Sequence, residues 1–449
     1  MLFTILLSPV QPVEDKVGLT NILEMETHDN EYAMPSGFFD GANKYVLFEG
    51  SNAGSGELAL TIYQSTNVLA QASAFLDLHD IKDLYERVAV TNVIQSWPAM
   101  VETPLTSGVQ VVYSPPYDPS EAKELAVFVH GWRMTESDYY SFSETMFKRL
   151  YWQGFQGRFA SLRWPTRSED TDPPILGLIP ADLLTYNRSE HIALKSGTGA
   201  AAYFTGLRER YTNYTISACA HSMGGVVMME SLKQLAAAEQ QPLDNLVLMQ
   251  AAVPAQCYDT TVTNLPLLVA TEASFPTPNT YSNYAAAMTN ALRRRAYNFH
   301  NADDFALATG TKTILGTTYN VSWEGNQSFL LSGAGENFTI KPNAFFGYYS
   351  DGTTGYWTNK WNQSSNYTSR VVSSAHELMP FVARSRSKAV GAQPGVGQVI
   401  NGGEFNLSTQ LGFGREDYDH SGQFHRNVQT LQVQGFYNQL LERLFSQTP

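Results

Sequence analysis

The chain has 449 residues, a formal net charge of −13 and a pI near 5.2; 43% of its residues are hydrophobic and 16% are charged. This composition is typical of a globular protein, because disordered chains lack the residues that bury apolar area. The negative charge disfavours nucleic acid as a partner, since its phosphates would be repelled.

The length exceeds one typical domain, so we expect a main domain with an additional module or large insertions. The two cysteines, Cys219 and Cys257, are too few for a disulfide framework and lack the spacing of a zinc site. Whether they pair is left open by the sequence. No metal or organic cofactor is expected, and the oligomeric state is not indicated.

Residues 1–110 have the pattern of a β-rich N-terminal module. Met1–Leu7 is apolar but too short to span a bilayer, and it resembles a strand or a truncated leader. No other segment approaches about 18 uninterrupted apolar residues, so we expect a soluble protein without a membrane span. The sequence leaves the localisation open, with secretion as one option if the N-terminus is truncated. Alternating residues 57–63, a turn and then 68–70 predict a β-hairpin.

From Leu125 onwards, short apolar runs alternate with segments of helical periodicity. This alternation predicts an α/β fold with a mostly parallel central sheet flanked by helices. The expected strands are 125–129, 157–163, 215–220, 246–251 and 297–301, and the expected helices are 136–152, 189–211, 224–238 and 423–444. We expect the main domain to cover residues 111–449.

Two stretches interrupt the alternation, at about 254–291 and 310–374. The second is rich in Gly, Asn, Ser, Thr and aromatic residues, as in Phe345–Tyr349 and Tyr356–Trp361. Loops of this length within a compact domain are usually lids or binding insertions. A decorated surface that packs on the N-terminal module is the alternative.

The sequence Ala220-His221-Ser222-Met223-Gly224 joins an apolar strand to a helix. A sharp strand-to-helix turn strains its apex residue and requires small residues two positions to either side, which Ala220 and Gly224 provide. Such a turn would raise the Ser222 hydroxyl above the sheet as a nucleophile. The backbone N–H of Met223, at the positive end of the following helix, would face developing negative charge. The alternative is a serine that caps a helix.

Upstream, the apolar run 125–129 ends in His130-Gly131-Trp132. With this turn and the Ser222 motif, the chain resembles the α/β-hydrolase superfamily, and its esterase and lipase branch in particular. The resemblance covers roughly residues 110–445 and implies that the N–H groups of Met223 and Trp132 form an oxyanion hole. Ala220, where glycine is usual, and the long insertion depart from the pattern. We expect His130 to tie the loop together by hydrogen bonds.

A nucleophilic serine requires a base, and the base requires an acid that fixes its tautomer. In the family the order along the chain is Ser, then Asp or Glu, then His. His420 lies on a polar, Gly-containing loop before the last helix, where the family places its histidine. His425, expected inside that helix, and His376 are the alternatives.

The acid is expected in the turn after the strand at 297–301, where Asp303 and Asp304 are adjacent. The family pattern of Asp, a variable residue, a small residue and an apolar residue matches Asp304 to Leu307, so Asp304 is favoured over Asp303. Asp259 is a further alternative. Any of them could instead be a turn or helix-cap residue.

The resemblance therefore implies a carboxylic ester hydrolase, a serine carboxylesterase with Ser222, His420 and Asp304 as its catalytic triad and a small or medium ester as substrate. The alternatives are a lipase or polyester hydrolase with an aromatic lid, an amidase or peptidase with the same triad, and a catalytically silent binding protein.

Overall fold

The computed structural model describes most of the main domain and parts of the N-terminal region. The described residues are 3–6, 22–25, 47–50, 53–93, 107–166, 182–253, 255–258, 284–302, 304, 307, 310–314, 317–321, 327–331, 336–340, 389–396, 399, 402–414, 418–425 and 430–445. The chain divides into two compact units, Met1–Leu84 with Gln429–Leu431, and Tyr85–Val428 with Gln432–Pro449.

The first unit contains only β-strands and one short 3-10 helix, Ile81–Asp83, among its described residues. Strands β1 (Phe3–Leu6), β2 (Ile22–Met25) and β3 (Leu47–Gly50) form an antiparallel sheet in the order β2-β1-β3. Residues 3–6 of the apolar opening therefore form a strand. The predicted hairpin is present as β4 (Gly54–Gln64) and β5 (Asn67–Leu78), which are joined by a two-residue turn.

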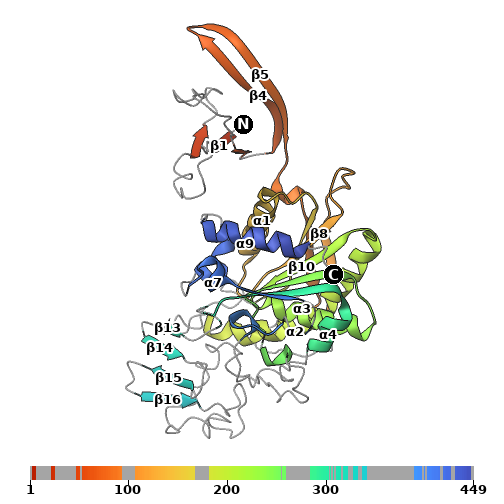
Figure 1. Ribbon diagram of the computed structural model, residues 1–449, viewed down its shortest axis with the longest axis vertical. Coiled ribbons are helices and arrows are strands. Elements are labelled where there is room, and N and C mark those ends of the chain that lie inside the picture. Colours follow the sequence, from red (N-terminus) through yellow and green to blue (C-terminus); the bar gives the residue numbers. More distant parts are fainter. Residues whose placement is uncertain are drawn as a thin grey trace. The chain divides into compact units, whose positions relative to one another are not determined.

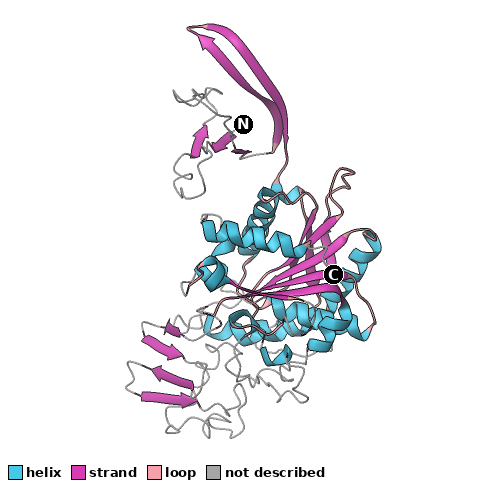
Figure 2. Ribbon diagram, in the orientation of Figure 1, coloured by secondary structure: helices cyan, strands magenta, loops and turns pink. Residues whose placement is uncertain are grey.

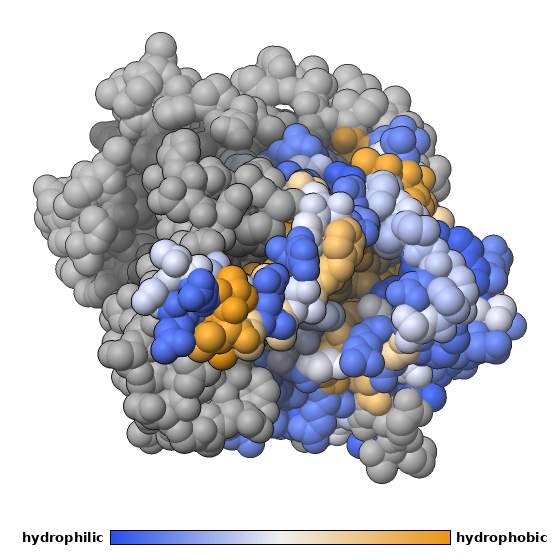
Figure 3. Space-filling model, turned by 90° about the horizontal axis from the view of Figure 1, so that it is seen from above, coloured by the Kyte–Doolittle hydropathy of each residue, from blue (hydrophilic) through white to orange (hydrophobic). Residues whose placement is uncertain are grey.

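One face of the β4–β5 hairpin is apolar. Leu58, Leu60 and Ile62 lie opposite the alanines at 74, 72 and 70, whereas Thr61 lies opposite Gln71 on the other face. Side chains alternate between the two faces of a strand, so the hairpin is amphipathic. Leu60 and Ile62 are 47% and 52% exposed. On the side of the molecule drawn in Figure 3, apolar residues lie in separate patches between hydrophilic ones.

The second unit is built on an eight-stranded sheet with the order β17-β12-β11-β10-β8-β9-β6-β7. All neighbouring strands are parallel except β7, which pairs antiparallel with β6 at the edge. The strands are β6 (Glu86–Thr91), β7 (Gly108–Tyr113), β8 (Glu124–Val129), β9 (Arg158–Arg163), β10 (Thr215–His221), β11 (Leu243–Met249), β12 (Leu292–His300) and β17 (Gly403–Asn406).

Helices cover both faces of this sheet (Figures 1 and 2). Helices α2 (Asp182–Arg210), α3 (Gly224–Ala237) and α4 (Ala285–Ala291) pack on one face, and α1 (Glu136–Trp152) and α9 (Leu431–Leu444) pack on the other. Along β8, Val127 belongs to the first core and Phe128 to the second. Because both faces are buried, the strands are continuous apolar runs, as the sequence predicts.

The predicted α/β fold is confirmed, and most predicted elements agree with the observed ones within a few residues. Helix α1 has the predicted bounds, because Thr135 forms a capping box with Asp138 at its start. Helix α2 begins seven residues before the predicted start, at Asp182 instead of Ser189. Strand β6 places part of the sheet before residue 110, and the division of the chain into domains at that residue stays a prediction.

The last helix begins later than predicted. Residues 418–424 form two short helical segments, α8 (Tyr418–Ser421) and a 3-10 turn (Gly422–Phe424), and α9 begins at Leu431. The Arg149 guanidinium donates hydrogen bonds to the main-chain carbonyls of Gln423 and His425, the latter at 2.8 Å. These carbonyls are therefore engaged by a side chain of α1, and His425 lies outside a helix.

The predicted insertion at 310–374 contains regular structure in its first part. Four antiparallel strands form a meander, β13 (Gly310–Ile314), β14 (Thr317–Val321), β15 (Gln327–Leu331) and β16 (Glu336–Ile340). Threonine, valine and aromatic residues favour strands there. The aromatic runs at 345–349 and 356–361 lie outside the described residues, as does the remainder of 341–388.

After this interval the chain returns to the sheet at the 3-10 turn Val390–Ala392. The N–H of Val390 donates to the carbonyl of Val253 at 2.7 Å, and that of Gly391 to Ala251 at 3.0 Å. The carbonyl of Gly391 accepts from the N–H of Asn301 at 2.9 Å. The returning segment therefore lies between the chain segments that follow β11 and β12.

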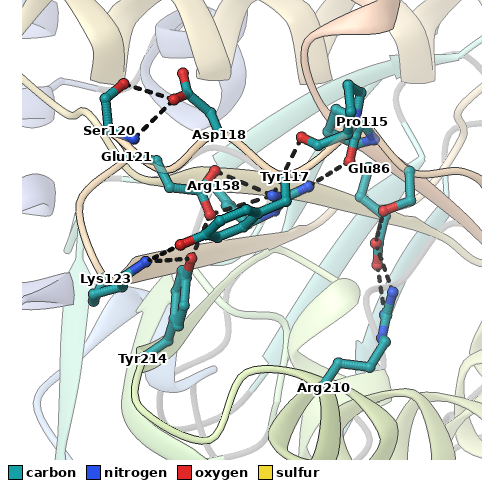
Figure 4. A network of polar contacts seen from close by, with 12 residues as sticks. Glu86, Pro115, Tyr117, Asp118, Ser120, Glu121, Lys123, Arg158, Arg210 and Tyr214 are labelled. Carbon is teal, nitrogen blue, oxygen red and sulfur yellow. Dashed lines mark hydrogen bonds and ion pairs between the residues drawn. The ribbon is translucent and has the colours of Figure 1, made fainter.

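A network of charged and aromatic side chains ties together the amino ends of the strands (Figure 4). Arg158, which opens β9, donates to the Glu121 carboxylate at 3.1 Å and to the Pro115 carbonyl at 2.6 Å. Glu86, which opens β6, accepts two hydrogen bonds from Arg210 at the end of α2, at 2.9 and 3.0 Å. This end of the sheet is thus braced by partly buried polar contacts, whereas Ser222 lies at the opposite, carboxyl end.

The loop after β8 is held by His130, which is buried and stacks on Trp164 with ring centroids 5.5 Å apart. One imidazole nitrogen, Nε2, accepts from the Trp164 backbone N–H at 3.2 Å, and Nδ1 lies 2.9 Å from the Gly131 carbonyl. Burial lowers the pKa of His130 to about 4. The imidazole is therefore neutral near pH 7, with its proton on Nδ1, and its contacts are those of a histidine that ties the loop together.

Two glycines of α2 are expected to respond oppositely to alanine. A Cβ on Gly197 would lie 2.4 Å from the Cβ of Glu230 on α3, whereas nothing lies within 4 Å of one on Gly206. We expect Gly197→Ala to lower the free energy of unfolding by about 1–3 kcal/mol. Gly206→Ala should raise it by roughly 0.5–1 kcal/mol. Urea denaturation of the two variants measures both effects; equal shifts would contradict this packing of α2 on α3.

The free energy of unfolding should fall in acid as His130 is protonated. The unfolded state takes up the proton near pH 6.5 and the folded state near pH 4, so this contribution is complete above pH 6.5 and is lost as the pH falls to 4. The loss corresponds to about 3 kcal/mol. Chemical denaturation between pH 7 and 4 measures it, and His130→Gln should show a shallower slope. An unchanged slope would exclude His130 as a source of the loss.

Candidate active site

Ser222 lies at the carboxyl end of β10, directly before α3. Its φ is +50°, in the left-handed region, although the residue is not glycine. The Ser222 N–H donates to the Met249 carbonyl at 3.1 Å, and its carbonyl accepts from Gly225 at 3.0 Å and Ala252 at 2.8 Å. These three hydrogen bonds hold a backbone conformation that is strained for a residue with a side chain.

Small residues around Ser222 allow neighbouring backbone to approach. A Cβ on Gly224 would lie 2.4 Å from the His130 carbonyl oxygen, and one on Gly131 would lie 3.0 Å from the Ser222 Cβ. Ala220 is fully buried. The loop after β8 and the start of α3 therefore pack directly against the serine, and larger side chains at 131 or 224 would separate them.

The three residues predicted as nucleophile, base and acid lie in one hydrogen-bonded line. His420 Nε2 is 3.1 Å from Ser222 Oγ, and His420 Nδ1 is 2.7 Å from Asp304 Oδ2. Asp304 is fully buried, whereas the side chain of His420 is 12% exposed and Ser222 is 8% exposed. The residues come from the turn after β10, the segment after β12, and α8, so the fold brings together positions up to 198 residues apart.

The Asp304 carboxylate accepts hydrogen bonds from Gln250 and Leu307 besides that of His420. Gln250 Nε2 donates to Oδ2 at 2.6 Å, and the Leu307 backbone N–H donates to Oδ1 at 3.2 Å. The Asp304 N–H donates to the Asn301 carbonyl at 3.1 Å, which forms the turn after β12. A buried carboxylate needs such donors, because the charge would otherwise be poorly solvated.

Of the four residues that the sequence offers as alternative acid or base, His425 alone belongs to the described part of the chain. Asp303, Asp259 and His376 lie outside the described residues. His425 packs edge-on against Phe142 at 5.3 Å between ring centroids, and burial, followed by the charge of Arg149, lowers its pKa. Ser222 Oγ is instead hydrogen-bonded to His420.

His221, next to the serine, supports the helical segment α8 that carries His420. Its Nε2 lies 2.7 Å from the His420 carbonyl oxygen, and the two rings are 4.9 Å apart between centroids. Burial, followed by the neighbouring His420 imidazole, lowers the pKa of His221 well below its ordinary value. The neutral ring therefore donates from Nε2 to that carbonyl and brings no charge into the site.

The two predicted oxyanion donors, Met223 and Trp132, adjoin the serine and the loop after β8 in the chain. Met223 immediately precedes α3, at a helix end where the first N–H groups have no partner within the helix. Trp132 follows Gly131, whose backbone packs against the Ser222 Cβ. Both residues are thus close in the chain to segments that contact the serine.

Among the described residues, no group of three or more His, Cys, Asp or Glu side chains could hold a metal ion. In the same part of the chain, no helix combines the length and the apolar character needed to cross a membrane. Cys219 and Cys257 are both buried and free.

Three residues of the site were not found from the sequence: His221, Gln250 and Gln423. Gln250 directly follows β11, the neighbour of β10 in the sheet. Gln423 lies three residues after His420. That proximity is a weak signal, because it does not indicate which way a side chain points.

Residues 117–286 match a family described as alpha/beta hydrolase of unknown function (DUF900). No curated protein matches the sequence significantly. Similar solved structures include an uncharacterized protein from Bacillus cereus ATCC 10987, with 11% identity over 43% of this chain and 47% of that chain and a TM-score of 0.25. Phospholipase PlaB from Legionella pneumophila has 14% identity over 40% of each chain and a TM-score of 0.21.

An esterase from Pyrobaculum calidifontis has 11% identity over 42% of this chain and 60% of that chain, with a TM-score of 0.22. The chain spans about half the length of these three solved structures. The family match covers strands β8 to β11, at the centre of the sheet. With its eight-stranded, mostly parallel sheet covered by helices on both faces, the chain has the α/β-hydrolase fold, and residues 117–286 match a family of alpha/beta hydrolases.

Proposed function

We propose that this protein is a carboxylic ester hydrolase that acts through an acyl-enzyme on Ser222. The observation that carries the proposal is the hydrogen-bonded line from Ser222 Oγ through the His420 imidazole to the Asp304 carboxylate, with contacts of 3.1 and 2.7 Å. A serine hydroxyl is almost fully protonated near pH 7 and needs an adjacent base, and the base needs an acid that orients it.

In the proposed mechanism, Ser222 Oγ attacks the ester carbonyl carbon while His420 Nε2 accepts the hydroxyl proton. The buried Asp304 carboxylate accepts from Nδ1–H, which keeps Nε2 free as the base and stabilises the imidazolium that forms. His420 then gives its proton to the leaving alcohol, and an acyl-enzyme remains. Water, deprotonated by His420, releases the acid by the same steps in reverse.

The tetrahedral oxyanion would accept hydrogen bonds from the N–H groups of Met223 and Trp132. The amino end of α3 adds the positive end of a helix dipole at the same place. Donors fixed before the reaction are effective because they need no reorganisation as charge develops.

Loss of the nucleophile should abolish hydrolysis. We expect Ser222→Ala to reduce kcat toward p-nitrophenyl acetate and butyrate by about 10⁶-fold, because a triad acts as a unit. A fluorophosphonate probe should label the parent and fail to label this variant. Ser137→Ala, at an exposed serine of α1, serves as the control. An unlabelled, inactive parent would favour a silent binding protein, and an active Ser222→Ala would exclude the proposed nucleophile.

The adjacent aspartates should differ in their effect. We expect Asp304→Asn to lower kcat by about 10⁴-fold, since an amide favours the wrong tautomer of the base. Asp303→Asn should stay within a few-fold of the parent, because Asp304 occupies the contact with His420. Steady-state kinetics on both variants test this assignment, which the reverse pattern would overturn.

A matched ester and anilide separate esterase from amidase activity. The amide has the poorer leaving group, so a site built for esters should turn over the ester far faster than the anilide with the same acyl group. A kcat/KM for the anilide equal to that for the ester would favour an amidase or peptidase. A chain-length series of p-nitrophenyl esters then tests for lipase-like preference.

A further inference from the structure

The acid and the base of the site belong to a closed ring of hydrogen bonds that includes two glutamines. Gln250 Nε2 donates to Asp304 Oδ2 at 2.6 Å, and Gln423 Nε2 donates to Gln250 Oε1 at 3.1 Å. The same Gln423 amide donates to the His420 carbonyl at 3.1 Å, and His420 Nδ1 closes the ring on Asp304 at 2.7 Å. Both glutamines are fully buried.

We propose that Gln250 and Gln423 are positioning residues that hold Asp304 and His420 in register with Ser222. This inference rests on the proposed function, since it assigns a role relative to that triad. Within the ring, Gln250 bonds to the Asp304 carboxylate and Gln423 bonds to Gln250 and to the His420 carbonyl, so each glutamine acts through the acid or the base. Loss of either glutamine should therefore affect kcat, which reports the chemical step, more than KM.

Gln250 is itself held in place from several sides. Its φ is +45°, a strained conformation for a residue with a side chain, and its N–H donates to the Phe299 carbonyl at 2.8 Å. On its other side lies Gly391, where an added Cβ would come within 2.2 Å of the Gln250 carbonyl carbon. Strain of this kind persists where surrounding structure determines it, and it often marks functional positions.

Gln423 connects the ring to the helices that cover the sheet. Its main-chain carbonyl accepts hydrogen bonds from the Arg149 guanidinium of α1 and from the Tyr437 hydroxyl of α9, the latter at 2.8 Å. The His420 carbonyl accepts a second hydrogen bond, from His221 Nε2 at 2.7 Å. The backbone of His420 is thus held by His221 and Gln423, and its imidazole is held by Asp304.

A neutral amide suits the position beside Asp304. A cation there would pair with the carboxylate and reduce its stabilisation of the imidazolium, whereas an amide orients the carboxylate and leaves its charge available. A carboxylate there would repel Asp304 unless it carried a proton. The identity of the residue at 250 therefore has a chemical consequence that a purely structural role would not have.

The test compares Gln250→Met, Gln423→Met and the double variant, with Gln241→Met, an exposed amide, as the control. We expect each single variant to lower kcat for a p-nitrophenyl ester by about 10- to 100-fold with little change in KM. The double variant should lose little more than the worse single variant, because the two amides act in one chain of hydrogen bonds. Thermal unfolding confirms that each variant is folded.

Gln250→Glu supplies a readout that does not depend on packing, since it keeps the size of the side chain. Two carboxylates in contact share one proton, and the protonated form of the new residue restores the donor to Asp304. The ratio of kcat/KM for Gln250→Glu to kcat/KM for Gln250→Met should therefore be above one in acid and fall as the pH rises. The rate of labelling by a fluorophosphonate should follow the same profile.

The outcomes separate this inference from the proposed function. If the parent neither hydrolyses esters nor reacts with the probe at Ser222, the proposed function fails and the inference fails with it. If the parent is active but folded Met variants keep its kcat, or the Gln250→Glu to Gln250→Met ratio does not change with pH, the inference alone is overturned. A loss in kcat with the expected ratio supports both.

Discussion

The left-handed backbone at Ser222 is the constraint around which this end of the sheet is arranged. For a residue with a Cβ it costs roughly 1–2 kcal/mol. Hydrogen bonds to Met249, Gly225 and Ala252 hold it, and the close approach of Gly131 and Gly224 leaves the serine enclosed by backbone. The turn raises the hydroxyl from the end of β10 toward His420 while α3 begins behind it. The glycines and the parallel register of β8, β10 and β11 together make this turn possible.

Burial distinguishes the roles of three histidines that lie near one another. His130 and His221 are buried, and their lowered pKa values keep both imidazoles neutral. Each uses its ring nitrogens to hold main chain: His130 the loop after β8, and His221 the carbonyl of His420. His420 is the one of the three that contacts both a carboxylate and the serine. The same side chain thus holds main chain in place at positions 130 and 221 and is the proposed base at position 420.

The sequence could predict the elements whose apolar pattern is strong and local. The runs at 125–129 and 215–220 are almost entirely apolar, which indicates central strands that are buried on both faces. The small residues around Ser222 indicate the sharp turn that joins β10 to α3. The sequence predicts the last helix from residue 423, but α9 begins at Leu431, because Arg149 engages the carbonyls of Gln423 and His425 in a contact over more than 270 residues. The glutamine ring could not be predicted for the same reason, since its contacts join segments distant in the chain.

Asp304 and His420 are 116 positions apart in the chain, and the segment between them leaves the sheet and returns to it at neighbouring points. The Asn301 N–H, just before Asp304, is bonded to the carbonyl of Gly391, where the chain comes back to the sheet. Closing a flexible loop costs only about 0.6 kcal/mol more for each doubling of its length. Related chains could therefore lengthen, shorten or exchange this excursion while the acid and base stay where they are. Such a change would introduce new segments next to the residues that carry the proposed acid and base.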